Sequence, residues 1–184
     1  MNFGSKDIAL SAVFAALYVV INVAQSLTVG NPTIYGPVQL RVADCLIALT
    51  ILLGWPVIAG VTFGCFLSNA YYFLGVVDIA FGPIANLIAA TIVLLLRKRR
   101  FMACVAGALP IGIIVGGYLS IFFDFPPPEA LSAFPAVVAM VISISMSSLI
   151  AIAGIGYVLL LALSRPNVIE PLKSHGLKTL ADSN

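Results

Sequence analysis

Seven polar residues lie at positions of an apolar chain where they could bind a small molecule. Each falls in or beside a turn that leads into an apolar segment, or within such a segment: Gln39, Arg41, Asp44, Asn69, Tyr72, Asp78 and Asn86. A charged group at the edge of a hydrocarbon layer is costly unless a partner or a ligand compensates it. Small-molecule sites typically combine mostly apolar walls with a few convergent polar groups. We therefore expect these side chains to line a cavity that opens to one side of a membrane.

Each of these residues also has a purely structural explanation. Arg41 and Asp44 are three positions apart and could pair with each other on one helix face. Asp78 could be an N-cap whose carboxylate satisfies free backbone donors. Tyr72, like its neighbour Tyr71, could anchor the chain at the membrane interface. Asn86 is harder to explain in this way, because an amide in hydrocarbon needs a partner.

Asp78, Gly82 and Asn86 recur every four residues and therefore share one face of a helix. The small residue in the middle of this stripe leaves space beside the two polar side chains. A ligand could fill that space, and so could a neighbouring helix.

The residues that carry catalysis in most enzymes are missing from this pattern. His175 is the only histidine, and the three cysteines are isolated within apolar segments, which argues against a disulfide, a metal centre and a catalytic site. No glycine-rich phosphate-binding loop with a lysine is present, so we expect the chain not to hydrolyse ATP. We predict a protein that is not an enzyme and that has no cofactor of its own.

Composition places these residues in a membrane protein. Hydrophobic residues make up 61% of the 184, charged residues only 9%, and the mean hydropathy is +1.14. A soluble domain carries about 25% charged residues. The sequence therefore predicts a multi-pass protein of the cell membrane, with the lipid bilayer as its surroundings and no nucleic-acid partner.

We predict an all-α fold in which one bundle of six transmembrane helices spans residues 1–164, followed by a polar cytoplasmic tail at residues 165–184. Glycine, proline and charged residues separate the apolar segments. The last apolar run is too long for one straight crossing, so its first residues should form a short interfacial piece before a crossing that begins near Pro135. The predicted crossings are residues 7–27, 41–53, 57–72, 78–96, 101–122 and about 135–163.

Both termini are predicted to be cytoplasmic, because the basic residues then gather on one side. Eight of the nine lie in the predicted cytoplasmic segments and only Arg41 lies outside. This distribution follows the positive-inside rule. The cytoplasmic set is Lys6, Arg97, Lys98, Arg99, Arg100, Arg165, Lys173 and Lys178.

The first crossing carries Ala12 and Ala16 on one face, with Ser11 and Ala15 beside them. Small residues at four-residue spacing let another helix approach closely within a membrane. Packing inside the bundle and docking of a partner protein both remain open for this face.

Three segments together give the chain a family resemblance. Residues 36–44 (GPVQLRVAD), 64–69 (GCFLSN) and 75–82 (GVVDIAFG) resemble, in order and spacing, the QueT family. The likeness covers roughly residues 9–125. Where that family typically has glutamate after the arginine, this chain has Asp44, which keeps the charge on a shorter side chain.

The QueT resemblance implies a substrate-binding S component of an energy-coupling factor (ECF) transporter for queuosine precursors. Such a subunit captures its ligand at the outer face and docks, here through Ala12 and Ala16, on a transmembrane coupling subunit that two ATPase subunits drive. A 7-deazaguanine-type base offers N–H donors that an aspartate can accept in pairs, and a ring that can stack on aromatic side chains. Asp78 or Asp44 is expected to bind this edge, with Gln39 and Asn86 assisting. Two alternatives are an S component for a folate- or thiamine-type vitamin and a membrane scaffold subunit without a transport role.

Overall fold

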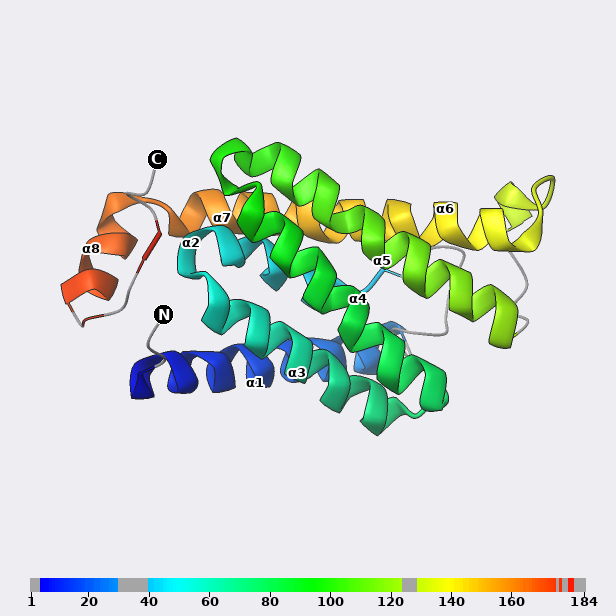
Figure 1. Ribbon diagram of the computed structural model, residues 1–184, viewed down its shortest axis with the longest axis horizontal. Coiled ribbons are helices and arrows are strands. Elements are labelled where there is room, and N and C mark those ends of the chain that lie inside the picture. The colour runs from blue at the N-terminus through cyan, green and yellow to red at the C-terminus, as the bar shows by residue number, and fades with distance from the viewer. Residues whose placement is uncertain (1–3, 30–39, 124–128, 175, 177–178, 181–184) are drawn as a thin grey trace.

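The computed structural model describes residues 4–29, 40–123, 129–174, 176 and 179–180, and every regular element within these ranges is a helix. Figure 1 shows the long helices running side by side in one bundle. The elements are α1 (Ser5–Val29), η1 (Val42–Leu49), α2 (Thr50–Leu53), α3 (Trp55–Tyr72), α4 (Val76–Leu95), η2 (Arg97–Arg99), α5 (Arg100–Phe122), η3 (Glu129–Leu131), α6 (Ala136–Ser148), η4 (Leu149–Gly156), α7 (Tyr157–Leu163) and α8 (Pro166–Ser174).

Four helical stretches of the described residues are long and apolar enough to cross a membrane: α1, α4, α5 with η2, and the continuous run Ala136–Leu163. The apolar stretch Val42–Leu53 is shorter. Helix α3 has 18 residues, which is about 27 Å at 1.5 Å per residue. The helical class and the predicted apolar segments are thus confirmed, whereas six crossings and cytoplasmic termini stay predictions.

Helices α1 and α3 pack closely because two glycines of α3 face α1. A Cβ atom at Gly60 would lie 2.5 Å from the Cβ of Phe14, and one at Gly64 would lie 2.7 Å from the Cβ of Tyr18. No side chain larger than hydrogen fits at these distances. The four-residue spacing of Gly60 and Gly64 thus lets the two helices approach closely.

Glycines also set the contact between α5 and α6. A Cβ atom at Gly112 would meet Ser145, and one at Gly116 would lie 2.7 Å from the backbone of Val141. The adjacent Gly117 does not belong to this contact, because a Cβ atom there would have no neighbour within 4 Å. The four-residue spacing of Gly112 and Gly116 places both on one face, and Gly117 falls on the next.

Two irregular helices meet in the centre of the bundle. The segment η1 is a 3₁₀ helix, almost entirely buried, and it packs against η4, a π-helix within the last long helical run. A Cβ atom at Gly156 of η4 would lie 2.6 Å from the carbonyl oxygen of Cys45 in η1. Departures from α-helical winding are often found at functional sites. The predicted crossing at residues 41–53 is therefore helical, but only its last part, α2, is an α-helix.

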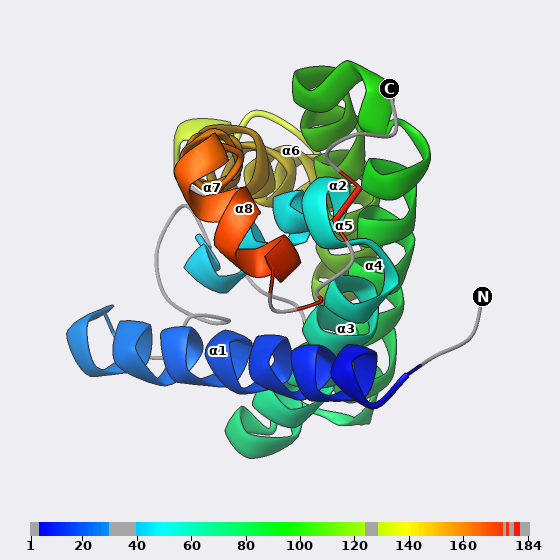
Figure 2. The same ribbon diagram turned by 90° about the vertical axis from the view of Figure 1, so that its left-hand side faces the viewer.

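The segment after residue 164 was expected to be a frayed tail, and the structure differs. Residues Pro166–Ser174 form α8, and Ile169 is buried against the core. Farther along, the backbone N–H of Leu180 donates to the carbonyl of Leu52 at 2.7 Å. The apolar side chains of Ile169 and Leu180 explain this association, because both pack against the hydrophobic core. Figure 2 views the bundle from the end that carries α8.

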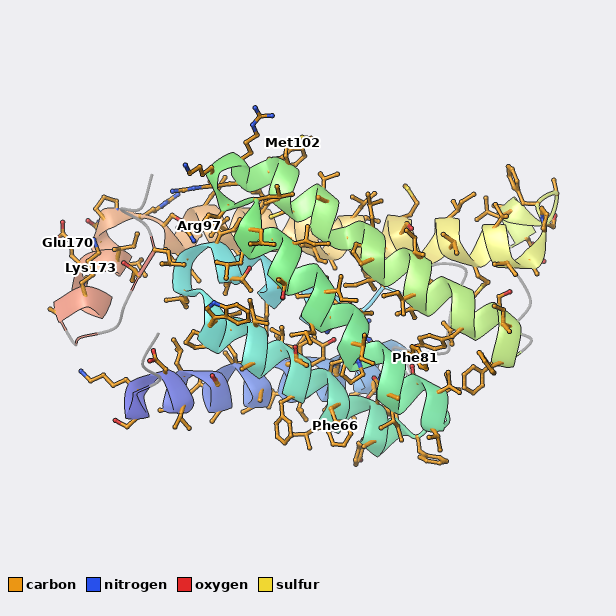
Figure 3. All side chains as sticks on the ribbon, in the orientation of Figure 1. Phe66, Phe81, Arg97, Met102, Glu170 and Lys173 are labelled. Carbon is orange, nitrogen blue, oxygen red and sulfur yellow. The ribbon has the colours of Figure 1, made fainter. Side chains whose placement is uncertain are left out.

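The two ends of the bundle differ in charge. Figure 3 places Arg97, Glu170 and Lys173 toward one end, whereas Phe81 lies toward the other. The start of α1 lies at the same end as α8 (Figure 1). This segregation agrees with the basic side that the sequence predicts, although the structure itself contains no membrane.

Candidate functional site

Asp44 is the centre of a buried polar cluster made by three elements. The hydroxyl of Tyr18, from α1, donates to Asp44 Oδ1 at 2.6 Å. The amide of Asn86, from α4, donates to the Tyr18 hydroxyl at 3.0 Å and approaches Asp44 Oδ1 at 3.4 Å. All three side chains are at most 3% exposed. The 3₁₀ helix η1 brings Asp44 to this position by directing it toward both α1 and α4.

Arg41 connects the start of η1 to α3. It precedes η1 in an extended backbone conformation, and its Nη1 donates to the thiol sulfur of Cys65 at 3.4 Å. The charge of Arg41 interacts with both Asp44 and Asp78. The alternative that Arg41 pairs with Asp44 alone, which sequence spacing left open, does not describe all of its surroundings, because Asp78 also lies within electrostatic range of Arg41.

Asp78 forms a second cluster at the start of α4. The hydroxyl of Tyr118, from α5, donates to Asp78 Oδ1 at 2.5 Å, and the amide of Asn69, from α3, donates to the Asp78 backbone carbonyl at 2.9 Å. The N-cap of α4 is Gly75, and no side chain caps the helix. The N-cap explanation of Asp78 is therefore wrong, because its carboxylate is turned toward α5.

The space beside Gly82 is filled by a neighbouring helix. A Cβ atom at Gly82 would lie 2.2 Å from the side-chain nitrogen of Asn69. The sequence left open whether a ligand or a neighbouring helix fills the space beside Gly82. In the structure, Asn69 of α3 fills it. The glycine is needed so that Asn69 can reach the Asp78 carbonyl.

Aromatic rings adjoin the Asp78 cluster. The ring of Tyr118 lies 6.4 Å from that of Phe81 and 6.4 Å from that of Phe123, measured between centroids. Phe81 is partly exposed at this end of the molecule (Figure 3). The tyrosine that bonds to Asp78 therefore belongs to a group of three aromatic rings.

The structure brings together five of the seven residues that the sequence selects: Arg41, Asp44, Asn69, Asp78 and Asn86. Tyr72 lies apart from the two aspartates and donates to the backbone carbonyl of Asn22 at 3.3 Å. Gln39 lies outside the described residues. Tyr71 is 75% exposed, in keeping with an interfacial anchor. That any of these residues binds a ligand stays a prediction.

Four residues of this polar region were not selected from the sequence. Tyr118 holds Asp78, and Tyr18, Asn22 and Gln25 form a polar face along α1. The three residues of α1 could have been selected from the sequence, because positions 18, 22 and 25 share one face of a helix in an otherwise apolar segment. Gln25 positions the start of η1, since it bonds to the Leu40 carbonyl and accepts the Val42 N–H at 3.0 Å.

Ala12 and Ala16 lie on the exposed side of α1, whereas Ala15 is buried. The backbone of Ser11 and Ala15 meets α3 at Gly60. Packing within the bundle therefore uses Ser11 and Ala15, and leaves Ala12 and Ala16 at the surface.

The chemistry available in the site is hydrogen bonding and charge pairing. The carboxylates of Asp44 and Asp78 both accept hydrogen bonds, so the cluster favours ligands that carry N–H donors or positive charge. Among the residues that the structure describes, no three His, Cys, Asp or Glu side chains are grouped so as to hold a metal ion.

Comparison with known proteins gives one family. No curated protein and no solved structure matches the chain. The model of the family described as QueT transporter matches residues 8–165, which is most of the chain and includes every residue of both aspartate clusters. The chain therefore belongs to the QueT transporter family.

Proposed function

We propose that this chain is the substrate-capture S component of an ECF-type uptake transporter, and that its ligand is a queuosine precursor, a 7-deazaguanine-type base. The observation that carries this proposal is the pair of buried aspartates, Asp44 and Asp78, with the half-buried Arg41 near them, inside a member of a transporter family. Ionised side chains in an apolar bundle are costly, and in membrane proteins they commonly mark a substrate or ion pathway.

The acceptors of the site suit the proposed ligand. A 7-deazaguanine edge presents several N–H donors side by side, and a carboxylate can accept two of them. Asp44 and Asp78 each accept a tyrosine hydroxyl. A ligand edge that bonds to these carboxylates would compete with the hydroxyls of Tyr18 and Tyr118 for the same oxygens.

The rings beside Asp78 suit the flat part of the same ligand. Tyr118 bonds to the carboxylate, and Phe81 and Phe123 adjoin the Tyr118 ring. A base whose edge bonds to Asp78 can lay its face against one of these rings. Hydrogen bonding fixes which heterocycle binds, whereas stacking contributes affinity with less discrimination.

Energy for uptake would come from partner proteins. The chain lacks a phosphate-binding loop, and we assign ATP hydrolysis to ATPase subunits that act through a transmembrane coupling subunit. Ala12 and Ala16 are small and exposed on α1, as a helix-docking surface in a membrane requires. In this proposal the protein crosses the cell membrane six times with both termini in the cytoplasm.

A binding titration tests the proposal. We expect 7-deazaguanine to bind the purified wild-type protein, and Asp44→Ala or Asp78→Ala to raise Kd by about 10- to 150-fold, the equivalent of one hydrogen bond to a charged group. Glu170→Ala, at an exposed site on α8, should leave Kd unchanged. Asp78→Asn keeps the shape of the side chain and separates loss of binding from loss of folding. Wild-type affinity in both alanine variants would refute the assignment.

A further inference from the structure

Asn22 has an unpaired carbonyl oxygen in the interior of the bundle. Its side chain is 1% exposed, and its NH₂ group donates to the hydroxyl of Ser68 at 3.2 Å. The Oδ1 atom has no hydrogen-bond partner in the protein. Among the described residues, Asn22 is the only fully buried one that carries such an atom, since the others with unpaired polar atoms are partly exposed.

Rotation of the amide does not remove the unpaired group. If the amide were turned over, Ser68 would bond to the oxygen, and the NH₂ group would become the unpaired end. Buried polar groups in native proteins are nearly always paired, so an exception of this kind calls for an explanation. Packing alone does not supply one, because an apolar side chain at position 22 would place no unpaired oxygen in the core.

The position of Asn22 connects it to the candidate site. It lies one helical turn from Tyr18 on the same face of α1, and Tyr18 bonds to Asp44. Its partner Ser68 is adjacent in α3 to Asn69, which bonds to the Asp78 backbone. Asn22 is therefore linked to the Asp44 cluster through α1 and to the Asp78 cluster through α3.

We propose that Asn22 Oδ1 accepts a hydrogen bond from an N–H group of the ligand, so that α1 forms one wall of the binding site. This inference rests on the proposed function and adds a residue that determines specificity. A neutral amide oxygen pairs with an uncharged donor such as a ring N–H or an exocyclic amine. The two carboxylates then bind one edge of the base, and Asn22 Oδ1 accepts a hydrogen bond from an N–H group that the carboxylates do not contact.

Ser68 and Tyr72 hold Asn22 in place for this role. Ser68 fixes the NH₂ end of the amide, and the Tyr72 hydroxyl bonds to the Asn22 backbone carbonyl at 3.3 Å. With one end of the amide fixed, the free oxygen has a defined direction before the ligand arrives. Preorganisation of this kind lowers the cost of binding.

The test compares Asn22→Leu with Thr62→Val, using 7-deazaguanine as the ligand in calorimetric titrations of the purified protein. Thr62 is the matched control, because its hydroxyl is also unpaired but its side chain is only half-buried in α3. We expect Asn22→Leu to raise Kd by about 5- to 150-fold, since it leaves a ligand N–H without an acceptor. The Tm of the ligand-free variant should equal or exceed that of the wild type. Thr62→Val should leave Kd unchanged.

Two results would overturn the inference while leaving the proposed function intact. One is a Kd for Asn22→Leu equal to that of the wild type. The other is a weaker Kd accompanied by a lower Tm of the ligand-free protein, which would assign Asn22 to packing. If the leucine variant does not fold, Asn22→Ala is compared in the same two measurements. A wild-type protein that does not bind 7-deazaguanine would refute the proposed function, and this inference with it.

Discussion

Removal of one hydroxyl group, by Tyr18→Phe, should destabilise the whole bundle, because Tyr18 links three of its elements. The hydroxyl donates to Asp44 Oδ1 at 2.6 Å and accepts from Asn86 at 3.0 Å, and the Tyr18 side chain is 0% exposed. Phenylalanine keeps the ring and therefore the packing against Gly64. The change thus isolates the two hydrogen bonds.

The expected magnitude lies between two reference values. Hydrogen bonds to charged groups contribute about 1.5–3 kcal/mol, whereas those between helices in a membrane protein average about 0.6 kcal/mol, with a maximum near 1.7 kcal/mol. The acceptor is a carboxylate, and its other contact, from Asn86, is longer, at 3.4 Å. We therefore expect Tyr18→Phe to lower the free energy of unfolding by about 2 kcal/mol.

Equilibrium unfolding in mixed micelles measures this change. Tyr157→Phe is the matched control, because the half-buried Tyr157 ring packs edge-on against Phe101 and phenylalanine preserves that contact. The control should change the free energy of unfolding by less than about 0.5 kcal/mol. If the two variants were equally stable, the Tyr18–Asp44 bond would contribute little, and the cluster would not hold α1 against η1 and α4.

Two further predictions concern the faces of α1. Gly64→Ala should lower the free energy of unfolding by about 1–3 kcal/mol, because its Cβ would lie 2.7 Å from that of Tyr18. The control is Gly117→Ala, which has no neighbour within 4 Å and should not lower the free energy of unfolding in this way. Equal effects of the two variants would contradict the close α1–α3 packing. Ala12→Leu with Ala16→Leu should leave ligand affinity unchanged and abolish co-purification with the coupling subunit, since both residues are exposed. Leucine at the exposed Ala70 of α3 is the control, and retention of the complex by the α1 variant would exclude this face as the docking surface.

The helices could be predicted from the sequence because their ends carry strong local signals. Gly54 and Pro56 separate α2 from α3, and a basic run follows α4. The winding of η1 and η4 could not be predicted, since it depends on the contact of Gly156 with the Cys45 carbonyl, which joins segments about a hundred residues apart. Local propensity carries no information about such a contact.

The candidate site was only partly predictable, for a related reason. Charges and amides such as Asp44 and Asn86 are conspicuous in an apolar chain, because desolvation requires a partner for them. Tyr18 and Tyr118 are not conspicuous, since a tyrosine in a membrane helix is commonly an interfacial or core residue. Their roles depend on how the helices are rotated about their axes, and only the packed structure fixes that rotation.

The small molecule bound to the protein as it is extracted from its membrane tests the central claim most directly. Mass spectrometry of the wild-type protein, purified without added ligand, should find a 7-deazaguanine-type base that is absent from the Asp44→Ala and Asp78→Ala variants. A folate- or thiamine-type vitamin in its place, or the same base retained by both variants, would contradict the account.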